Sequence, residues 1–103
     1  MKLQIFNFNR LKKQIESQIF QLYNDYQNNL KLVKFETENV KMSKKNTFIA
    51  FEKYRLGELS DIDLRQIQIM QLEAENSRLL AQFQAKQTET ELLRISGKIL
   101  SNK

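Results

Sequence analysis

The chain has no cysteine, no histidine and no proline, and its only glycines are Gly57 and Gly97. Without cysteine, disulfide bonds and thiolate metal sites are excluded. Without histidine, the commonest general base and metal ligand is also missing. Because proline is absent and glycine is rare, few positions interrupt a helix. The composition therefore favours long helices and offers little for catalysis.

Long apolar runs are missing as well. No stretch approaches the roughly 20 apolar residues of a membrane span. The first seven residues, MKLQIFN, include a lysine but no apolar core of the length that a signal peptide needs. We therefore expect no export signal within the chain as written. Residues 3–8 are too few for periodicity to distinguish the end of a strand from a frayed terminus.

Charge is divided unevenly between the two halves. Residues 1–56 contain 11 basic and 5 acidic residues, giving +6, and residues 57–103 contain 6 basic and 7 acidic residues, giving −1. Two halves with net charges of opposite sign suit two helices that lie side by side. A basic half is also compatible with nucleic-acid binding. However, acidic residues interrupt the lysines throughout, so a solvated helix face is the favoured interpretation.

The first helix is predicted from a seven-residue repeat that runs from about residue 9 to residue 56. One apolar column contains Ile19, Tyr26, Val33, Val40, Thr47 and Tyr54. Flanking columns supply Ile15, Leu22, Tyr23, Leu30 and Phe51. The opposite side has no apolar member. A helix so long and polar would fray alone, so its apolar seam needs partners.

The second helix, predicted from about residue 61 to residue 97, carries two apolar stripes. The first contains Ile62, Ile69, Leu72, Leu79, Phe83 and Leu93. The second contains Leu64, Ile67, Ala74, Ala81, Ala85, Leu92 and Ile95. Two stripes imply two neighbours, and we expect the chain to form homo-oligomers. A charged residue at Leu79 or Phe83 is expected to loosen the hairpin.

The link at residues 57–60 combines a stop signal with a start signal. Gly57 can adopt the left-handed conformation that ends a helix. Ser60 is a favourable N-cap, Asp63 stands at the third position of a capping box, and Leu59 and Leu64 occupy the positions of a hydrophobic staple. So short a link forces the second helix to fold back. The prediction is an all-α, coiled-coil-like, antiparallel two-helix hairpin in one domain.

Groups with catalytic or metal-binding chemistry are not found. Ser60 has no histidine to activate it as a nucleophile. Asp61 and Asp63 are two residues apart and so point to different sides of a helix, which suits N-terminal capping better than metal binding. No cofactor is expected, and the chain is predicted not to be an enzyme.

Residues around the link resemble a known family. The ordered set is Tyr54-x-x-Gly57-x-x-Ser60-x-x-Asp63-Leu64, followed by Leu93-x-x-Ser96-Gly97-x-x-Leu100 and preceded by a Tyr23-x-x-Tyr26 stretch. These features, spread over residues 12–100, resemble the last helical hairpin of the TolC-like outer-membrane efflux proteins. Where some members have a second aspartate three residues after Asp63, this chain has Gln66.

The resemblance implies a trimeric exit duct for drug efflux or type I secretion. Its helices would form a periplasmic tube below an outer-membrane barrel, so that the hairpin is a fragment of a larger protein whose membrane segments and export signal lie elsewhere. The hairpin tip would dock a periplasmic adaptor that connects to an inner-membrane transporter. The resemblance assigns that docking tip to Tyr54, Arg55, Gly57, Glu58, Leu59, Ser60 and Asp61. Asp63 becomes a candidate for the constriction at the closed end.

A second hypothesis needs no duct. The chain would be a free-standing coiled-coil interaction module, for example a dimer that forms a four-helix bundle. Nucleic-acid binding ranks below both hypotheses.

Overall fold

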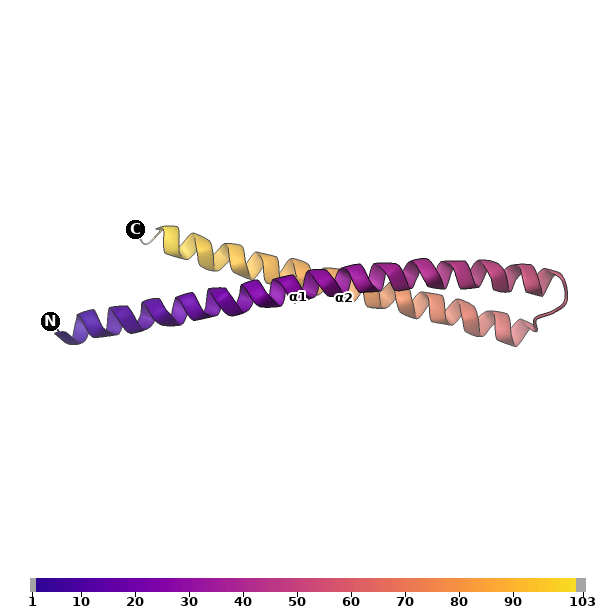
Figure 1. Cartoon of the computed structure of the whole chain (residues 1–103), viewed down its shortest axis with the longest axis horizontal. Helices are drawn as coiled ribbons and strands as arrows, with labels where there is room; N and C mark the ends of the chain where they lie inside the picture. The colour runs from indigo at the N-terminus through magenta and orange to yellow at the C-terminus, as the bar shows by residue number, and fades with distance from the viewer. Residues whose placement is uncertain (1, 102–103) are drawn as a thin grey trace.

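The computed structural model describes residues 2–101, and side-chain surroundings within residues 7–97. Two helices account for nearly all of it: α1 is Lys2–Arg55 and α2 is Asp61–Ser101. They run antiparallel and join through a short corner (Figure 1). No strand occurs within residues 2–101. The predicted all-α helical hairpin is therefore confirmed.

Both helices extend further than the repeat indicated. α1 begins at Lys2 instead of near residue 9, and α2 continues to Ser101 instead of ending near residue 97. Residues 3–8 are helical, so neither of the two alternatives considered for them holds. The physical reason is the lack of breakers: no proline occurs, and a single glycine such as Gly97 costs a helix only about 1 kcal/mol relative to alanine.

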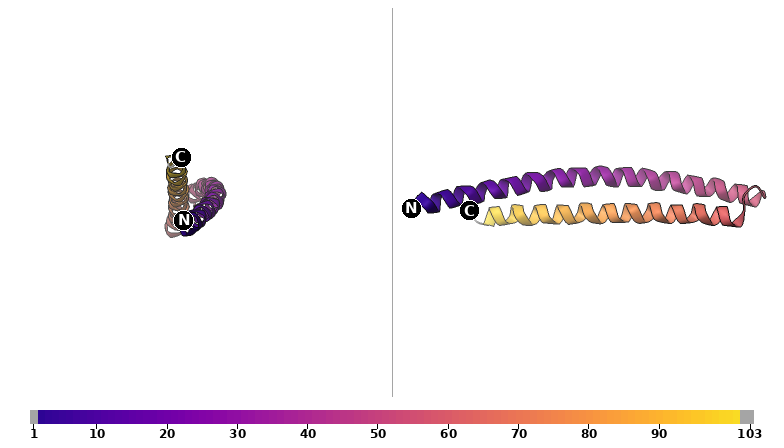
Figure 2. Two further views of the ribbon diagram at one scale, coloured as in Figure 1. Left: turned by 90° about the vertical axis from the view of Figure 1, so that its left-hand side faces the viewer. Right: turned by 90° about the horizontal axis from the view of Figure 1, so that it is seen from below.

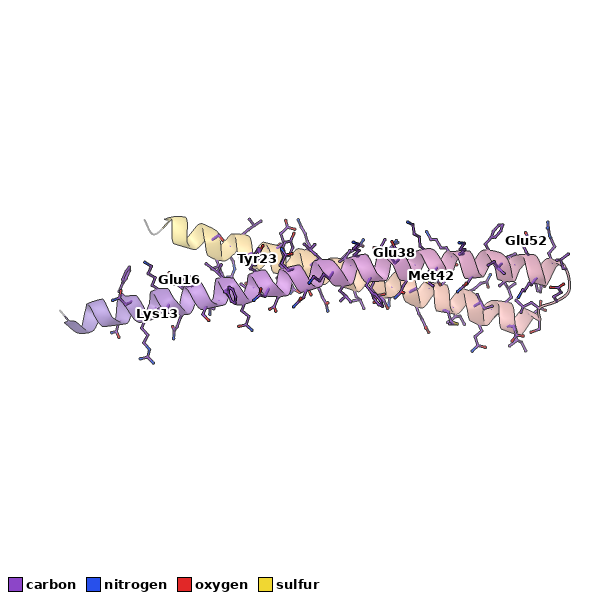
Figure 3. The ribbon with its side chains drawn as sticks, in the orientation of Figure 1. Lys13, Glu16, Tyr23, Glu38, Met42 and Glu52 are labelled. Carbon is purple, nitrogen blue, oxygen red and sulfur yellow. The ribbon has the colours of Figure 1, made fainter. Side chains whose placement is uncertain are left out.

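The hairpin is a thin rod with extents of 82 × 19 × 15 Å. α1 is the longer arm, with 54 residues against 41 in α2. Its N-terminal part therefore extends past the end of α2, and α1 bows gently along the straighter α2 (Figure 2). Long side chains project outward along the whole shaft, among them the exposed Lys13 and Glu38 (Figure 3). Such a shape leaves most side chains near solvent.

The helices meet along positions that alternate by three and four residues, as in a coiled coil. In α1, the residues of this seam that are at least half-buried are Ile15, Ile19, Leu22, Tyr26, Asn29, Val33, Glu36, Val40, Ser43, Thr47 and Ala50. In α2, they are Leu64, Ile67, Gln71, Ala74, Arg78, Ala81, Ala85, Thr88, Leu92 and Ile95. The second predicted stripe of the second helix is therefore the one that packs against α1.

Small side chains form much of the centre of the seam. Within residues 7–97, the buried apolar residues are Val40, Ala50, Leu64, Ala81 and Ala85. Three of the five are alanines, which allow close approach of the helices but contribute little apolar area each. The hairpin therefore has a narrow core and little hydrophobic stabilisation of its own.

One prediction about the seam is wrong. Tyr23, Leu30 and Phe51 were expected to help form the seam, but their side chains are exposed in the hairpin. A partly polar column that includes Asn29, Glu36 and Ser43 instead packs beside the apolar column and completes the seam. Polar residues in this column hid it from a search for apolar periodicity.

The burial of Leu79 and Phe83 in the hairpin, on which their predicted loosening rests, is also contradicted. These side chains remain 63% and 66% exposed, and they do not contribute to the seam. The entire first stripe of α2, Ile62 to Leu93, is exposed in the hairpin. We call it the outer stripe, with members Ile62, Ile69, Leu72, Leu79, Phe83 and Leu93.

A hydrogen bond fixes the alignment of the two helices. The Asn29 side-chain amide donates to the Thr88 hydroxyl at 2.8 Å, and Thr88 in turn donates to the Gln84 carbonyl at 2.9 Å. Polar side chains within a coiled-coil seam select one axial alignment over others. Asn29 and Thr88 therefore lie at the same height along the axis of the hairpin.

Candidate functional site

The corner, residues 54–63, is where the two sets of helix-ending signals meet. Tyr54 and Arg55 end α1, Gly57 to Ser60 lie in the link, and Asp61 and Asp63 open α2. All the residues predicted for adaptor docking, together with Asp63, thus lie at one end of the rod. The resemblance to the duct family implied that these residues dock an adaptor and that Asp63 lines a constriction. Both roles stay predictions.

Gly57 ends α1 through a left-handed backbone, with φ at 77°. Its N–H donates to the Tyr54 carbonyl at 3.0 Å, and the Glu58 N–H donates to the Lys53 carbonyl at 2.8 Å. This pair of bonds defines the Schellman motif, which satisfies carbonyls left free at a helix end. Apart from Gly57 and its two chain neighbours, no atom lies within 4 Å of where a Cβ on Gly57 would stand. The backbone of the corner is therefore tightly turned, while the space next to Gly57 is open.

Ser60 begins α2 as predicted. Its hydroxyl oxygen accepts a hydrogen bond from the Asp63 N–H at 3.2 Å, and its carbonyl accepts the first helical bond from Leu64 at 3.0 Å. Leu59 is half-buried and Leu64 is buried, as expected for the two positions of a staple. These contacts hold α2 in its fold-back direction.

Tyr54 and Asp61 face each other across the corner. Side-chain hydrogen bonding with the Asp61 carboxylate, followed by charge repulsion from it, raises the pKa of the Tyr54 hydroxyl above its ordinary value of 10.0. Arg55 is engaged elsewhere, because its guanidinium contacts Glu52 at 2.7 Å within α1. Glu58 and Asp63 are exposed. The outward face of the corner is therefore acidic.

Exposed apolar side chains also lie at the corner, and they were not among the residues named for adaptor docking. Leu56 is 69% exposed and Ile62 is 77% exposed. A shallow hollow along the first turns of α2 includes Ile62, Arg65 and Ile69. Ile62 had a usable signal, since it begins the outer stripe seven residues before Ile69. The corner thus offers a partner both carboxylates and apolar contact.

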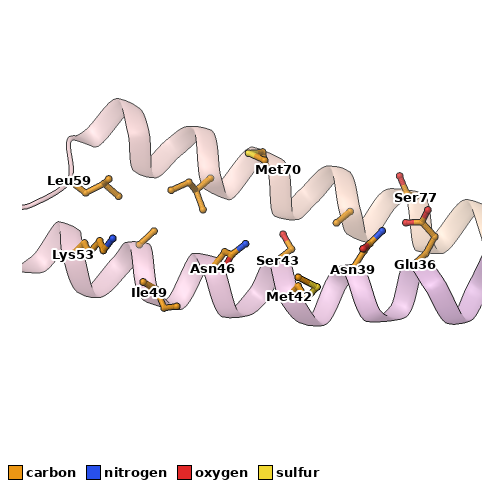
Figure 4. A pocket seen from close by; sticks show the side chains of 13 residues that line it. Glu36, Asn39, Met42, Ser43, Asn46, Ile49, Lys53, Leu59, Met70 and Ser77 are labelled. Atoms are coloured by element: carbon orange, nitrogen blue, oxygen red, sulfur yellow. The ribbon is translucent and has the colours of Figure 1, made fainter.

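A groove runs along one face of the hairpin, from the corner toward its middle. Its volume is about 660 Å³, and its walls come from both helices. Asn39, Ser43 and Asn46 rise from α1 toward α2, and Met70 and Ser77 line the opposite wall (Figure 4). The groove is open and mixed in polarity, and Ala50 is its buried lining residue. Sequence reasoning missed it, since it arises from the way two helices fit together.

No group of three or more metal-ligating side chains occurs among the described residues. Neither α1 nor α2, over the part that the structure describes, has a stretch long and apolar enough to cross a bilayer. In comparisons with known proteins, no family model, no curated protein and no solved structure matches this chain.

Proposed function

We propose that this chain is the last helical hairpin of a TolC-like outer-membrane exit duct, and that its corner docks a periplasmic adaptor. The observation that carries the proposal is the two-sided pattern of α2. One stripe packs against α1, and the outer stripe is left without a neighbour. A helix in the wall of a tube needs a neighbour on each side, so this pattern is what a wall element requires.

The corner supports the same proposal. Its spacing of Tyr54, Gly57, Ser60 and Asp63 produces two interlocked helix caps within a few residues. Helix ends present backbone groups to a partner, and Glu58, Asp61 and Asp63 add carboxylates. An adaptor tip that carries arginine would meet both kinds of acceptor. In this proposal the duct is a homotrimer, with the adaptor linking it to an inner-membrane transporter.

Fractionation of the source cells tests the proposal. An antibody raised against the hairpin should detect, in the outer-membrane fraction, an oligomer whose subunits are several times longer than 103 residues. A subunit of 12.3 kDa found only outside that fraction would contradict the duct and leave the free-standing module. That second candidate is favoured by one observation, that α1 and α2 form a complete seam without a third element.

Docking is tested with two matched glycine substitutions in the full-length duct. Gly57→Trp places a large side chain on the open corner, and Gly97→Trp places the same side chain on the exposed shaft. We expect Gly57→Trp to abolish adaptor cross-linking and antibiotic resistance, whereas Gly97→Trp preserves both. Both variants should still reach the outer membrane as trimers. Equal effects of the two substitutions would argue against docking at the corner.

The role of Asp63 is tested separately. Asp63→Asn keeps capping ability but removes the charge, whereas the Ser60 cap itself is untouched. If Asp63 lines the constriction of the duct, Asp63→Asn raises single-channel conductance and weakens block by divalent cations. Conductance and block that match the unsubstituted duct would reduce Asp63 to a helix-capping residue.

A further inference from the structure

The side of α1 that faces away from α2 has an unusual composition over its middle part. Val33, Val40 and Thr47 lie in the seam, which fixes the heptad positions that point outward. Between residues 31 and 49, these positions hold only charged or large apolar residues, with no amide and no hydroxyl. They are Lys31, Lys34, Phe35, Glu38, Lys41, Met42, Lys45, Phe48 and Ile49, and all nine are exposed. We call these nine residues the outer face of α1, which is about 27 Å long.

The outer face of α1 has an excess of positive charge. Residues 31–45 contain five lysines and two glutamates, giving +3. Of the two glutamates, Glu36 is half-buried in the seam, so Glu38 is the one carboxylate that stands among the lysines. The ion pairs found within residues 7–97 are Glu52–Arg55, Lys86–Glu89 and Glu91–Arg94, and none of them involves these five lysines.

The neighbouring part of α2 does not neutralise this charge. Because Asn29 and Thr88 lie at the same height, residues 31–45 of α1 run beside residues 72–86 of α2. That segment of α2 contains two glutamates, one arginine and one lysine, so its net charge is zero. The middle of the rod is therefore positive, and the charge is concentrated on α1.

An apolar row accompanies the lysines. Phe35, Met42 and Ile49 follow one another at intervals of seven residues, and Phe48 lies beside Ile49. The four side chains are between 46% and 67% exposed, although Met42 and Ile49 also line the groove. Lysines and apolar row share one side of a nearly straight helix, so a flat surface contacts all of them at once.

The composition of the outer face of α1 favours one class of anionic partner. Protein interfaces are depleted in lysine and glutamate, and the reading of nucleic-acid bases relies on amides and hydroxyls as well as cations. An anionic bilayer needs neither. About four to eight basic residues on one amphipathic helix attract anionic headgroups, and apolar side chains enter the boundary between headgroups and acyl chains. Lysine stems are long enough to lie along that boundary while the ammonium group stays in water.

We propose that the outer face of α1 binds the surface of a bilayer that contains anionic lipids. The rod lies parallel to the surface, the lysines contact the phosphate and carboxylate groups of the lipids, and the apolar row enters the headgroup layer. α2 then faces the solvent. The proposal does not depend on the duct function, because it uses neither the corner nor the outer stripe.

Flotation of lipid vesicles with the full 103-residue chain tests the proposal. One set of vesicles contains equal amounts of phosphatidylcholine and phosphatidylserine, and the other contains phosphatidylcholine alone. We expect the chain to float with the mixed vesicles and to stay in solution with the neutral ones. Salt at about 1 M shortens the screening length to about 3 Å and should release the chain. Flotation with neither set, or equally with both, would overturn the proposal.

Two double variants locate the contact on the hairpin. Lys34→Gln with Lys41→Gln removes two charges from the outer face of α1, whereas Lys53→Gln with Lys86→Gln removes two from the groove and from α2. All four lysines are exposed, so circular dichroism should show a folded hairpin in both variants. Each lysine near an anionic surface strengthens binding about fivefold, so the first variant should bind the mixed vesicles about 25-fold more weakly. The second should stay within about threefold of the native chain.

A pair of phenylalanines separates insertion into lipid from attraction to any polyanion. Phe35 is on the outer face of α1 and Phe83 is on α2, and both are exposed. Phe35→Gln should weaken binding to the mixed vesicles at least about fivefold, whereas Phe83→Gln should leave it unchanged. Equal effects within either pair of variants would overturn the proposal. So would tighter binding to a short DNA duplex than to the mixed vesicles, because the face would then serve nucleic acid.

Discussion

Gly57 and Gly97 are chemically identical residues in opposite backbone conformations. Gly57 has φ at 77°, and Gly97 lies within the regular helix α2. Beyond the adjoining backbone, neither has an atom within 4 Å of an added Cβ, so substitution by alanine tests the backbone alone. Gly57→Ala should destabilise the chain by about 1–2 kcal/mol, since an L-residue resists the left-handed region.

Gly97→Ala is the control, with the opposite sign. Alanine in a helix interior is better than glycine by about 0.5–1 kcal/mol, so this variant should be more stable than the native chain. Urea unfolding followed by circular dichroism measures both. Stabilisation by Gly57→Ala would mean that the corner does not require a left-handed residue in solution.

Tyr54 gives the corner a dependence on alkaline pH. Its pKa is raised by Asp61 in the folded hairpin, so the folded state holds the phenolic proton more tightly than the unfolded state does. The resulting stability is fully present below pH 10.0 and is lost as pH rises through the raised pKa. Tyr54→Phe has no proton to lose and should lose less stability over that window. Identical melting profiles for the two chains above pH 10.0 would contradict this expectation.

At the scale of an element, α2 presents one face to α1 and another to its surroundings. Ala81 is 2% exposed, while Leu79, two residues away, belongs to the outer stripe. Ala81→Lys should destabilise the hairpin by roughly 3 kcal/mol, because it buries an unpaired charge and overfills the seam. Leu79→Lys should change the stability of the monomeric hairpin by less than about 0.5 kcal/mol. Thermal melts at low protein concentration separate the two, and similar losses would show that the outer stripe also contacts α1.

The same element shows how far the sequence could predict the seam. Gly57, Ser60 and the stripes of α2 were identified correctly, because caps and periodicity are local properties. Which stripe packs inward could not be read locally, since it depends on which side α1 fits closely. In α1, Tyr23 and Leu30 were favoured because they are apolar, but the partly polar column of Asn29 and Ser43 packs instead. The groove was unpredictable for the same reason, because its walls come from both helices.

At the scale of the whole molecule, the rod has a small hydrophobic core and a large exposed apolar surface. Among the described residues no side chain larger than Leu64 is buried in the hairpin, and large apolar residues lie exposed on both helices. A domain of this kind reaches full stability only when neighbours cover it. The stability of the chain should therefore rise with its concentration.

The tight corner also sets the order in which the chain folds. Each contact between α1 and α2 closes a loop of chain that includes the corner. These loops are shortest next to Gly57 and longest at the open end. The hydrogen bond from Asn29 to Thr88 already joins residues 59 apart. Longer loops lose more chain entropy on closing. The two helices should therefore begin to pack at the corner, and packing should then proceed toward the termini. Backbone amides near Ala50 and Leu64 should then exchange with deuterium more slowly than those near Ile19 and Ile95. Uniform protection along the rod would indicate that the two arms pair all at once.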